Sequence, residues 1–175
     1  MSVEYVILVN KNDQPLGGME KMEAHEKGTL HRAFSVFIFN SEGKMLLQKR
    51  ADEKYHSPGL WTNTVCSHPR ANEKTSDAAH RRIVEEMGFD CEFEEAFSFV
   101  YKADVGQGLT EHEFDHVFIG ESDTLPIPNQ EEVGDFKYVA LDWVVEDVKN
   151  HPENYTVWFM IALKEVADYF EGKNA

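Results

Sequence analysis

Apolar and polar residues alternate in several short runs along the chain, a pattern typical of β-strands. The first run ends at the turn-forming residues 10–15, after which a loop containing Gly17 and Gly18 is expected. Strands are predicted at Val3–Val9, Phe34–Asn40, Lys44–Lys49, Leu60–Val65, Cys91–Lys102, Glu113–Ile119 and Phe136–Leu141. The second and third of these are joined by a short turn that ends at Gly43, so they predict a hairpin of largely buried strands.

Helical spacing of apolar residues replaces this alternation in three other stretches. Helices are predicted at Ser76–Met87, Asp142–Lys149 and Tyr155–Phe170. In the first of them Ala79, Ile83 and Met87 form an apolar stripe, and Gly88 is placed to end the helix. The side chains expected to cap its first turn are those of Thr75, Ser76 or Asp77. Strands mixed with only three helices predict a single-domain α+β or α/β sandwich over residues 1–175, with a mixed sheet flanked by helices.

The composition agrees with one globular domain, since the 175 residues are 42% hydrophobic and 28% charged. The longest apolar runs, such as Phe34–Phe39, are far shorter than the roughly 18 residues of a membrane-spanning helix. The segment Met1–Glu4 lacks the basic and apolar parts of a signal peptide, so we expect a cytoplasmic protein with no membrane partner. Two cysteines exclude a framework of several disulfides.

A formal net charge of −15 disfavours nucleic acid as a partner, because nucleic-acid binding depends on clustered Lys and Arg. An anionic small molecule would need a local exception in so acidic a protein. That exception would be a bound metal ion, a compact basic cluster, or both.

The predicted helix that starts at Ser76 gathers charges on one face. Arg82, Glu85 and Glu86 lie three and four residues apart, so this face offers carboxylates suited to Mg²⁺ and a cation suited to a diphosphate. A solvated helix face with ordinary ion pairs is the alternative interpretation of such a pattern. The wider segment Ser67–Phe89 resembles the Nudix box, and the matching residues are Glu73, Arg81, Ile83, Glu85, Glu86, Gly88 and Phe89.

Two residues depart from the Nudix pattern. Ser67 stands where the pattern has Gly, and Arg82 stands where Nudix hydrolases carry a Glu that helps to bind the catalytic metal. An arginine can hold a phosphate but does not ligate a cation. The resemblance therefore implies a branch of the family that binds a diphosphate without cleaving it.

Two further segments resemble one such branch. Trp61–Pro69 is similar to the cysteine motif of type I isopentenyl-diphosphate isomerases, and Gly108–Glu113 is similar to their glutamate motif. The resemblance extends over nearly the whole chain, from about Val3 to the helix around Trp158. It implies a metal-dependent enzyme of isoprenoid precursor biosynthesis. Its reaction would convert isopentenyl diphosphate into dimethylallyl diphosphate, by protonation and deprotonation through a tertiary carbocation.

The same resemblance implies a metal site of three imidazoles and two carboxylates. Its ligands would be His25, His31, His68, Glu111 and Glu113. The two carboxylates lie on one face of the chain if their segment is extended. This donor set suits Mn²⁺, Mg²⁺ or Zn²⁺, and the sequence does not choose among them. Surface or packing roles are expected for the other histidines, which are His56, His80, His112, His116 and His151.

Cys66 ends an apolar strand, where a free cysteine is often no more than a small buried hydrophobe. The motif instead implies a proton carrier. Metal and basic neighbours are expected to shift its thiol toward thiolate from an ordinary pKa of about 8.5. Cys91 lacks such a motif and is expected to be structural. The resemblance makes Glu113 the second proton carrier, with Tyr101 as its hydrogen-bonded helper.

The resemblance also implies how the substrate is held. Trp158 would stabilise the carbocation with its π-face, and Trp61 would line the pocket unless it only packs in the core. The diphosphate would lie among Lys21, Arg50, Lys54 and Arg82. A Mg²⁺ ion would bridge the diphosphate to Glu86 and to the backbone carbonyl of Cys66.

Two other functions remain open at this point. A Nudix hydrolase acting on a nucleoside or prenyl diphosphate would explain the acidic residues of the Nudix-box helix but leaves Cys66 and Glu113 without a purpose. A silent metal-binding module would keep the ligands and lose the proton carriers, and both carriers are present. We expect an enzyme whose partner is a small prenyl diphosphate, as a monomer or a weak homodimer.

Overall fold

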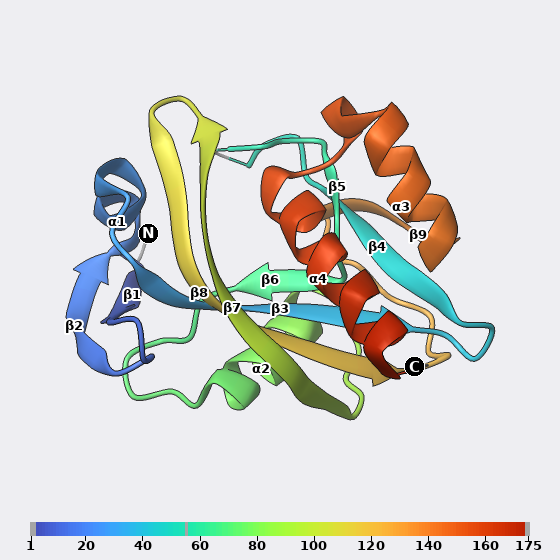
Figure 1. Ribbon diagram of the computed structural model, residues 1–175, viewed down its shortest axis with the longest axis horizontal. Helices are drawn as coiled ribbons and strands as arrows, with labels where there is room; N and C mark the ends of the chain where they lie inside the picture. The colour runs from blue at the N-terminus through green and yellow to red at the C-terminus, as the bar shows by residue number, and fades with distance from the viewer. Residues whose placement is uncertain (1–2, 55, 174–175) are drawn as a thin grey trace.

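The sheet is built around β3 (His31–Phe39), in which every residue from 33 to 38 is buried. The computed structural model describes residues 3–54 and 56–173 of the chain. The other strands are β1 (Tyr5–Val9), β2 (Pro15–Glu20), β4 (Lys44–Arg50), β5 (Trp61–Thr62), β6 (Val65–Ser67), β7 (Phe93–Gly106), β8 (Leu109–Glu121) and β9 (Val133–Ala140). The helices are α1 (Lys21–Lys27), α2 (Thr75–Met87), α3 (Leu141–Asn150) and α4 (Val157–Lys173), with a short 3₁₀ turn at Pro152–Asn154 (Figure 1).

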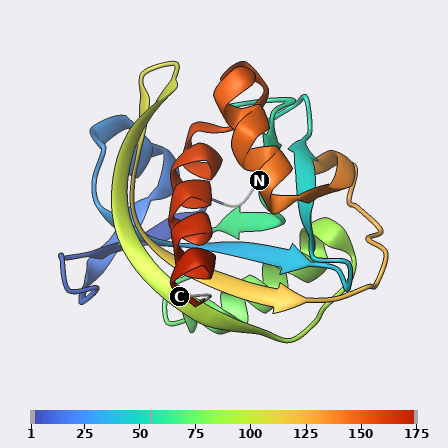
Figure 2. The same cartoon turned by 45° about the vertical axis from the view of Figure 1, so that its right-hand side comes forward.

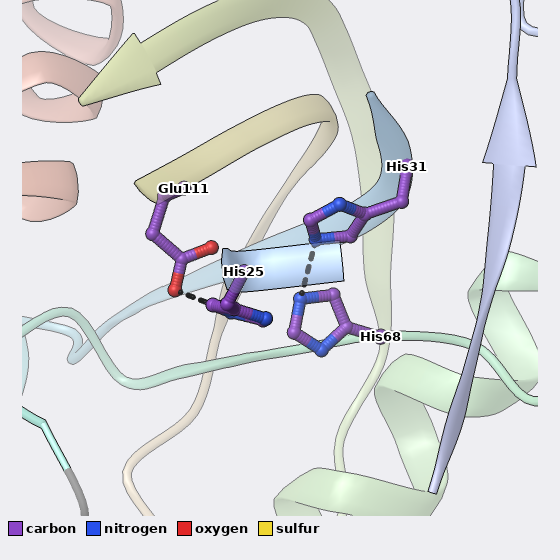
Figure 3. A group of neighbouring side chains, drawn as sticks. All are labelled: His25, His31, His68 and Glu111. Carbon is purple, nitrogen blue, oxygen red and sulfur yellow. Dashed lines mark hydrogen bonds and ion pairs between the residues drawn. The ribbon is translucent and has the colours of Figure 1, made fainter. Parts of the chain in front are cut away.

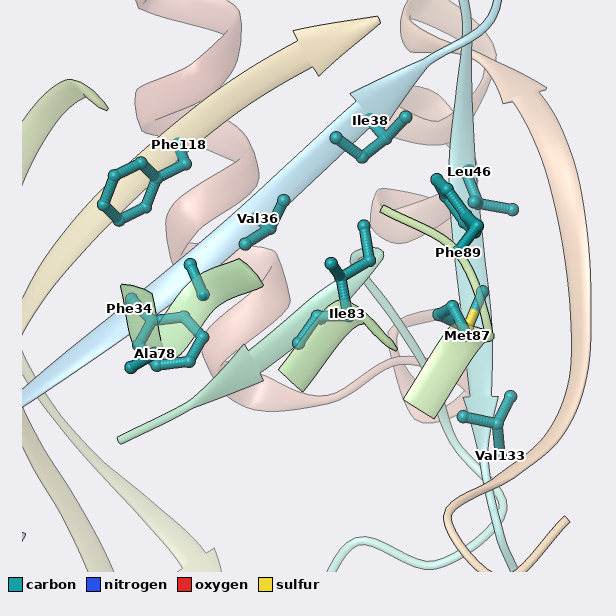
Figure 4. Packing of buried hydrophobic residues seen from close by; sticks show 12 residues of the cluster. Phe34, Val36, Ile38, Leu46, Ala78, Ile83, Met87, Phe89, Phe118 and Val133 are labelled. Atoms are coloured by element: carbon teal, nitrogen blue, oxygen red, sulfur yellow. The ribbon is translucent and has the colours of Figure 1, made fainter. Parts of the chain in front are cut away.

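The two faces of β3 belong to two different hydrophobic cores, because successive side chains of a strand point to opposite sides. Phe34, Val36 and Ile38 pack in the core that includes the apolar stripe of α2 (Figure 4). Phe37 packs on the other side, in the core formed with α3 and α4. Figure 2 shows α4 crossing one side of the sheet, with α2 on the opposite side. The predicted sandwich of a mixed sheet flanked by helices is therefore confirmed.

The pairing of the strands brings distant parts of the chain together. β3 runs parallel to β8 from His31↔Glu113 to Phe39↔Glu121, and β8 pairs antiparallel with β7 on its other edge. β3 and β4 meet only at Phe39↔Met45, next to the turn that joins them. The predicted hairpin is confirmed, but the pairing between its strands is short, because β8 and β6 pair with the rest of β3 while β9 pairs with β4.

The strand predicted at Leu60–Val65 is broken in the structure. β5 pairs with β4, and β6 pairs with β3, so the chain crosses from one strand to the other at residues 63–64. Side chains satisfy the backbone at this crossing: Asn63 Nδ2 donates to the carbonyls of Val36 and Val65, and Thr64 Oγ1 donates to that of Leu46. The local pattern gave no sign of these long-range hydrogen bonds.

The loop predicted around Gly17 and Gly18 is also wrong, since this segment is β2, which pairs antiparallel with β1. The helix that follows, α1, was not predicted. Its seven residues are too few for intrinsic propensity to hold a helix in water. The Glu20 carboxylate caps it by accepting hydrogen bonds from the backbone of Met22 and Glu23, and Gly28 ends it at a φ of 65°.

Helix α2 matches its prediction except at the first turn. Its apolar stripe is fully buried, and Gly88 ends it in the left-handed conformation, where a Cβ would clash with the Ile127 carbonyl oxygen. The cap position is Lys74, which makes no side-chain capping bond, so the predicted capping by Thr75, Ser76 or Asp77 is wrong. None of the helices within the described residues is long and apolar enough to cross a membrane.

Candidate active site

Three adjacent strands place polar side chains in one row across the sheet. The register pairs Tyr101 on β7 with Glu113 on β8, and Glu113 in turn with His31 on β3. Neighbours in such a row share one face of the sheet, with strands about 4.8 Å apart. The hydroxyl of Tyr101 donates a hydrogen bond to Glu113 Oε1, and His31 Nε2 lies 3.3 Å from Glu113 Oε2. Two predicted site residues and the predicted helper are therefore in contact.

A cluster of imidazoles surrounds the end of this row. One ligand atom from each of His25, His31, His68 and Glu111 lies within 4.8 Å of the others (Figure 3). They come from different elements: α1, β3, the segment after β6, and β8. His31 Nε2 faces His68 Nε2 at 3.3 Å, and His68 Nε2 lies 2.7 Å from Glu113 Oε2, so Glu113 adjoins the cluster. The structure brings all five predicted ligands together.

The hydrogen bonds of two rings aim their ligand nitrogens inward. His25 Nδ1 lies 2.6 Å from the Lys21 carbonyl, and His31 Nδ1 lies 2.8 Å from the Thr29 carbonyl. A ring nitrogen that faces a carbonyl carries the proton, so the Nε2 atoms of a neutral ring are left with lone pairs. Metal-ligating histidines in proteins are held in the same way.

The donor set fits a divalent cation. The lone pair of His25 Nε2 faces Glu111 Oε1 at 3.0 Å, a repulsive arrangement unless a proton or a cation intervenes. Glu111 Oε2 is buried and has no hydrogen-bond partner within the described part of the chain. Burial disfavours charge on His25 and His31, but the adjacent Glu111 and Glu113 outweigh it and raise the pKa of both rings. Both carboxylates therefore favour positive charge at the rings, and a bound divalent cation would supply such charge.

Glu113 is a buried carboxylate held from several sides. Burial alone would raise its pKa, but hydrogen bonds from His31 and Tyr101 and the other neighbouring groups lower the pKa to about 2. Burial and the adjacent Glu113 charge together raise the pKa of Tyr101 well above its usual value. Tyr101 therefore remains a hydrogen-bond donor to an ionised carboxylate at neutral pH.

Cys66 lies in β6 beside Trp158, the second residue of α4. Trp158 Nε1 donates a hydrogen bond to Cys66 Sγ at 3.0 Å, and the guanidinium of Arg50 lies 5.1 Å from the centre of the Trp158 ring. Burial raises the pKa of the Cys66 thiol to about 12, although Arg50 lowers it. Among the protein groups burial outweighs Arg50 and keeps the proton on sulfur, and the shift toward thiolate expected beside a metal ion stays a prediction.

These groups meet at one cavity. Its lining residues are Lys21, Arg50, Lys54, His56, Cys66, Ser67, His68, Arg82, Glu86, Glu111, Glu113 and Trp158. The two proposed proton carriers and the four predicted diphosphate-binding cations thus share its wall. Trp61 does not line it within the described residues. It packs beside the α4 core, with Lys137 Nζ 4.2 Å from its ring centre, so packing is the one of its two expected roles that the structure shows.

Three of the four cations are paired with carboxylates. Lys21 Nζ lies 2.8 Å from Glu4, and Lys54 Nζ lies 2.6 Å from Glu132. Arg82 contacts several acids, Glu85 at 2.8 Å, Glu86 at 3.2 Å and Glu132 at 3.5 Å. Arg50 differs, because it forms no ion pair with a carboxylate among the described residues, and its buried Nε has no hydrogen-bond partner there. Arg50 is the cation of this set most available to an incoming anion.

Glu86 fits a second cation on the same wall. Burial raises the pKa of this carboxyl, with Arg82 opposing the shift. Its Oε2 accepts no hydrogen bond of good geometry within the described residues, although Arg82 Nη2 lies 3.2 Å away. A buried carboxylate oxygen with spare capacity suits Mg²⁺. The carbonyl of Cys66, predicted to share that ion, stays a prediction.

Sequence reasoning did not assign three residues of this region to the site. Glu132 bridges Lys54 and Arg82 from the segment before β9, and Ser67 lines the cavity. His56 is 4% exposed and also lines the cavity, although a surface or packing role was expected. Burial and Arg50 lower the pKa of His56 to about 3, so the ring is neutral. In the sequence His56 follows the two predicted diphosphate-binding residues Arg50 and Lys54 and precedes β5. This position was the available signal that it belongs to the site.

Comparison with known proteins agrees with this geometry. A family model described as the NUDIX domain matches residues 29–159. Isopentenyl-diphosphate Delta-isomerase 2 of Aromatoleum aromaticum is 52% identical over 163 residues, covering 93% of this chain and 86% of that protein. The isopentenyl-diphosphate Delta-isomerase of Pectobacterium atrosepticum is 47% identical over 171 residues, covering 98% and 96%. The chain belongs to the isopentenyl-diphosphate Delta-isomerase family of NUDIX proteins.

Solved structures support the same fold. A crystal structure of a Deinococcus radiodurans protein superposes with a TM-score of 0.77 at 18% identity, over 93% of this chain and 98% of that one. A MutT protein from Methanosarcina mazei superposes with a TM-score of 0.66 at 15% identity, over 83% and 96%. At such identities the likeness concerns the fold alone. Membership in the isopentenyl-diphosphate Delta-isomerase family rests on the sequence relatives and confirms the resemblance carried by the segments Trp61–Pro69 and Gly108–Glu113.

Proposed function

We propose that the protein converts isopentenyl diphosphate into dimethylallyl diphosphate, with Cys66 and Glu113 as the two proton carriers. The observation that carries this proposal is their common cavity: a thiol and a carboxylate line it together with a set of cations. Moving a double bond along an allylic chain needs two positioned proton-transfer groups. Hydrolysis by a metal-activated water needs no thiol.

The reaction balances without any redox partner. One carrier gives a proton to the terminal alkene carbon, whose electron pair forms the new C–H bond and leaves a tertiary cation. The other carrier removes a proton from the carbon nearer the diphosphate, and the released electron pair forms the new double bond. After the product has left, one proton returns from bulk water to the first carrier and one proton leaves the second carrier for bulk water, so both carriers are reset.

The aromatic wall suits the cationic intermediate. Trp158 is 5% exposed and lines the cavity beside Cys66. The face of an indole attracts a cation with about 0.5–2 kcal/mol, more when water is excluded. Water excluded from the site would also be unable to trap the carbocation. The buried position of Trp158 supports both roles.

The cations and the implied metal ions would hold the diphosphate end. Arg50, Lys21, Lys54 and Arg82 supply donors that suit phosphate oxygens. A divalent ion, Mn²⁺, Mg²⁺ or Zn²⁺, would be held by the histidine cluster with Glu111 and Glu113, and Mg²⁺ would be held by Glu86 and Cys66. When bound, these ions would neutralise charge on the carboxylates and on the diphosphate. The chain's own residues would do the rest, binding the anion and moving protons.

We further propose that the protein works in the cytoplasm on a small molecule, as a monomer or a weak homodimer, without nucleic acid or membrane partners. The net charge of −15 supports the absence of a nucleic-acid partner. Light scattering over a range of concentrations would measure the oligomeric state.

The test compares two cysteines. Wild type, Cys66→Ala and Cys91→Ala would be incubated with isopentenyl diphosphate while dimethylallyl diphosphate is measured by NMR and phosphate release by a colorimetric assay. Wild type and Cys91→Ala should form dimethylallyl diphosphate without releasing phosphate. Cys66→Ala should lose at least ~10²–10⁴ in kcat, the usual contribution of a proton-transfer group, while it still binds the diphosphate.

Two outcomes would contradict the proposal. A wild-type rate for Cys66→Ala would remove the thiol from the reaction. Phosphate release alone by the wild type would favour a hydrolase, the alternative function for a NUDIX protein. Cys91 is a suitable control because it is the other free cysteine and packs beside the α2 core, away from the cavity.

A further inference from the structure

His56 occupies a position between the two halves of the site. It lies in the connection from β4 to β5, where its ring is 4% exposed and lines the cavity. One side of the ring faces the histidine cluster, and another side faces the aromatic wall. The proposed reaction assigns it no task.

The polar contact of His56 reaches a predicted metal ligand. His56 Nε2 lies 3.5 Å from Glu111 Oε1, the same oxygen that His25 Nε2 approaches at 3.0 Å. The rings of His25 and His56 are stacked, with centroids 5.9 Å apart. Glu111 Oε2 has no hydrogen-bond partner among the described residues. Two imidazoles, those of His25 and His56, therefore flank the other oxygen of this carboxylate.

His56 also makes an aromatic contact with Trp158, the residue proposed to face the carbocation. Its ring meets Trp158 edge to face, with centroids 5.4 Å apart and planes at 89°. Aromatic rings prefer this arrangement because a positive ring edge meets a negative face. The backbone carbonyl of His56 also accepts a hydrogen bond from Arg50 Nη2 at 3.2 Å, and Arg50 lies over the same indole. Residue 56 thus contacts two groups that bound the substrate space.

We propose that His56 is a positioning residue, which holds Glu111 in place for the metal ion through its ring nitrogen and holds Trp158 in place through its ring edge. This inference rests on the proposed isomerase function and extends it. His56 acts through Glu111 and Trp158, so it is not a proton carrier. Its two contacts are made by different parts of one side chain, and substitutions can separate them.

Each contact has its own measurable consequence. Residues that orient metal ligands typically change metal affinity 10- to 100-fold when they are removed. Loss of the Glu111 contact should therefore weaken metal binding in the absence of any substrate. Loss of the Trp158 contact should leave metal binding intact and lower kcat at saturating metal, because the indole would no longer be held over the cavity.

The experiment uses three substitutions of one residue. His56→Phe keeps the ring and loses the nitrogen, His56→Gln keeps an N–H and loses the ring, and His56→Ala loses both. The Kd of the metal-free protein for Mn²⁺ alone would be measured from the electron paramagnetic resonance signal of free Mn²⁺. The kcat and KM for isopentenyl diphosphate would be measured at saturating Mn²⁺, and Tm would report folding. His151→Ala, at an exposed histidine, is the control.

The proposal expects the two functions to separate. His56→Phe should raise the Mn²⁺ Kd by about 10-fold or more with kcat near wild type, and His56→Gln should keep the Kd and lower kcat. His56→Ala should show both losses. A role in packing alone would let His56→Phe restore every measurement. That result, or an unchanged Kd in both His56→Phe and His56→Ala, would overturn the proposal.

The design distinguishes this inference from the proposed function. If the wild type forms no dimethylallyl diphosphate, the proposed function fails, while the Mn²⁺ titrations still test the Glu111 contact. If the wild type isomerises the substrate and the His56 variants match it in both Kd and kcat, only the positioning role fails. Should His56→Ala prove unstable, the comparison of Phe with Gln carries the test.

Discussion

Replacing Tyr101 by Phe removes one hydroxyl from a buried part of the site. The ring of Tyr101 is 7% exposed and is stacked with Phe99 at a centroid distance of 5.8 Å, contacts that a phenylalanine keeps. What is lost is the hydrogen bond to Glu113 Oε1. Tyr101 lies behind Glu113 and does not line the cavity within the described residues, so substrate contacts stay as they are.

The size of the effect follows from the charge on the acceptor. Hydrogen bonds to charged groups contribute about 1.5–3 kcal/mol, and the Glu113 carboxylate is ionised and buried. At about 1.36 kcal/mol for each factor of ten, this corresponds to a fall of roughly 10- to 150-fold in kcat if Glu113 moves a proton. KM should change little, since the lost bond is not made to substrate.

The assay is steady-state formation of dimethylallyl diphosphate at saturating metal, with Tyr155→Phe as the matched control. Tyr155 also donates to a carboxylate, Asp147 Oδ2 at 2.6 Å, but outside the cavity. That control should lower Tm and keep kcat within about twofold. A Tyr101→Phe enzyme with wild-type kcat, or one with only a raised KM, would refute the role of Tyr101. An equal loss of kcat in the control would trace the effect to general destabilisation.

Further predictions concern binding of the anion and the metal. Arg50→Ala should raise KM by about 10- to 150-fold with little change in kcat, because a charge-assisted phosphate contact exists both before and during the reaction. Steady-state kinetics would check this, with the exposed residue Arg70 changed to Ala as the control. A large loss of kcat at unchanged KM would contradict it. Chelation should abolish activity and a divalent ion should restore it, so full activity in a metal-free preparation would exclude the metal. His31→Gln should weaken Mn²⁺ binding by about 10- to 100-fold in a direct titration, and unchanged affinity would remove His31 from the ligand set. A metal ion at 100 times its Kd should raise the free energy of unfolding by about 2.7 kcal/mol, which would be measured as a higher Tm. An unchanged Tm would mean that the unfolded chain binds the metal equally well.

Much of the sheet could be predicted because its cores impose simple periods. Apolar residues on both sides of β3 and the stripe of Ala79, Ile83 and Met87 on α2 are visible in the sequence. Helix α1 could not be predicted, since seven residues with a Glu cap depend on packing against the rest of the fold. The break between β5 and β6 also escaped, because Asn63 and Thr64 satisfy backbone groups far away in sequence.

The site divides in the same way between motif and tertiary structure. Cys66 and Glu113 stand in recognisable motifs, and the alternation of Glu111 with Glu113 predicts that both face one side of a strand. His56 and Glu132 lie in connecting segments, where no period fixes the direction of a side chain. Their contacts with Trp158, Lys54 and other site residues depend on how those segments cross the sheet, which a local pattern does not specify.

The register of β8 connects the stability of the fold with the position of the chemistry. Its residues 109, 111, 113, 115 and 117 are all buried, and the same face changes from carboxylates near the start to Val117 within the α4 core. A slip of one residue would turn Glu111 and Glu113 to the opposite face and expose the apolar residues that hold α4. In the parallel pairing with β3, the residue directly opposite Glu113 is His31. The hydrophobic core therefore sets the register, and the register sets which side chains share the cavity. Packing at the other end of the strand thus maintains the costly burial of Glu111 and Glu113.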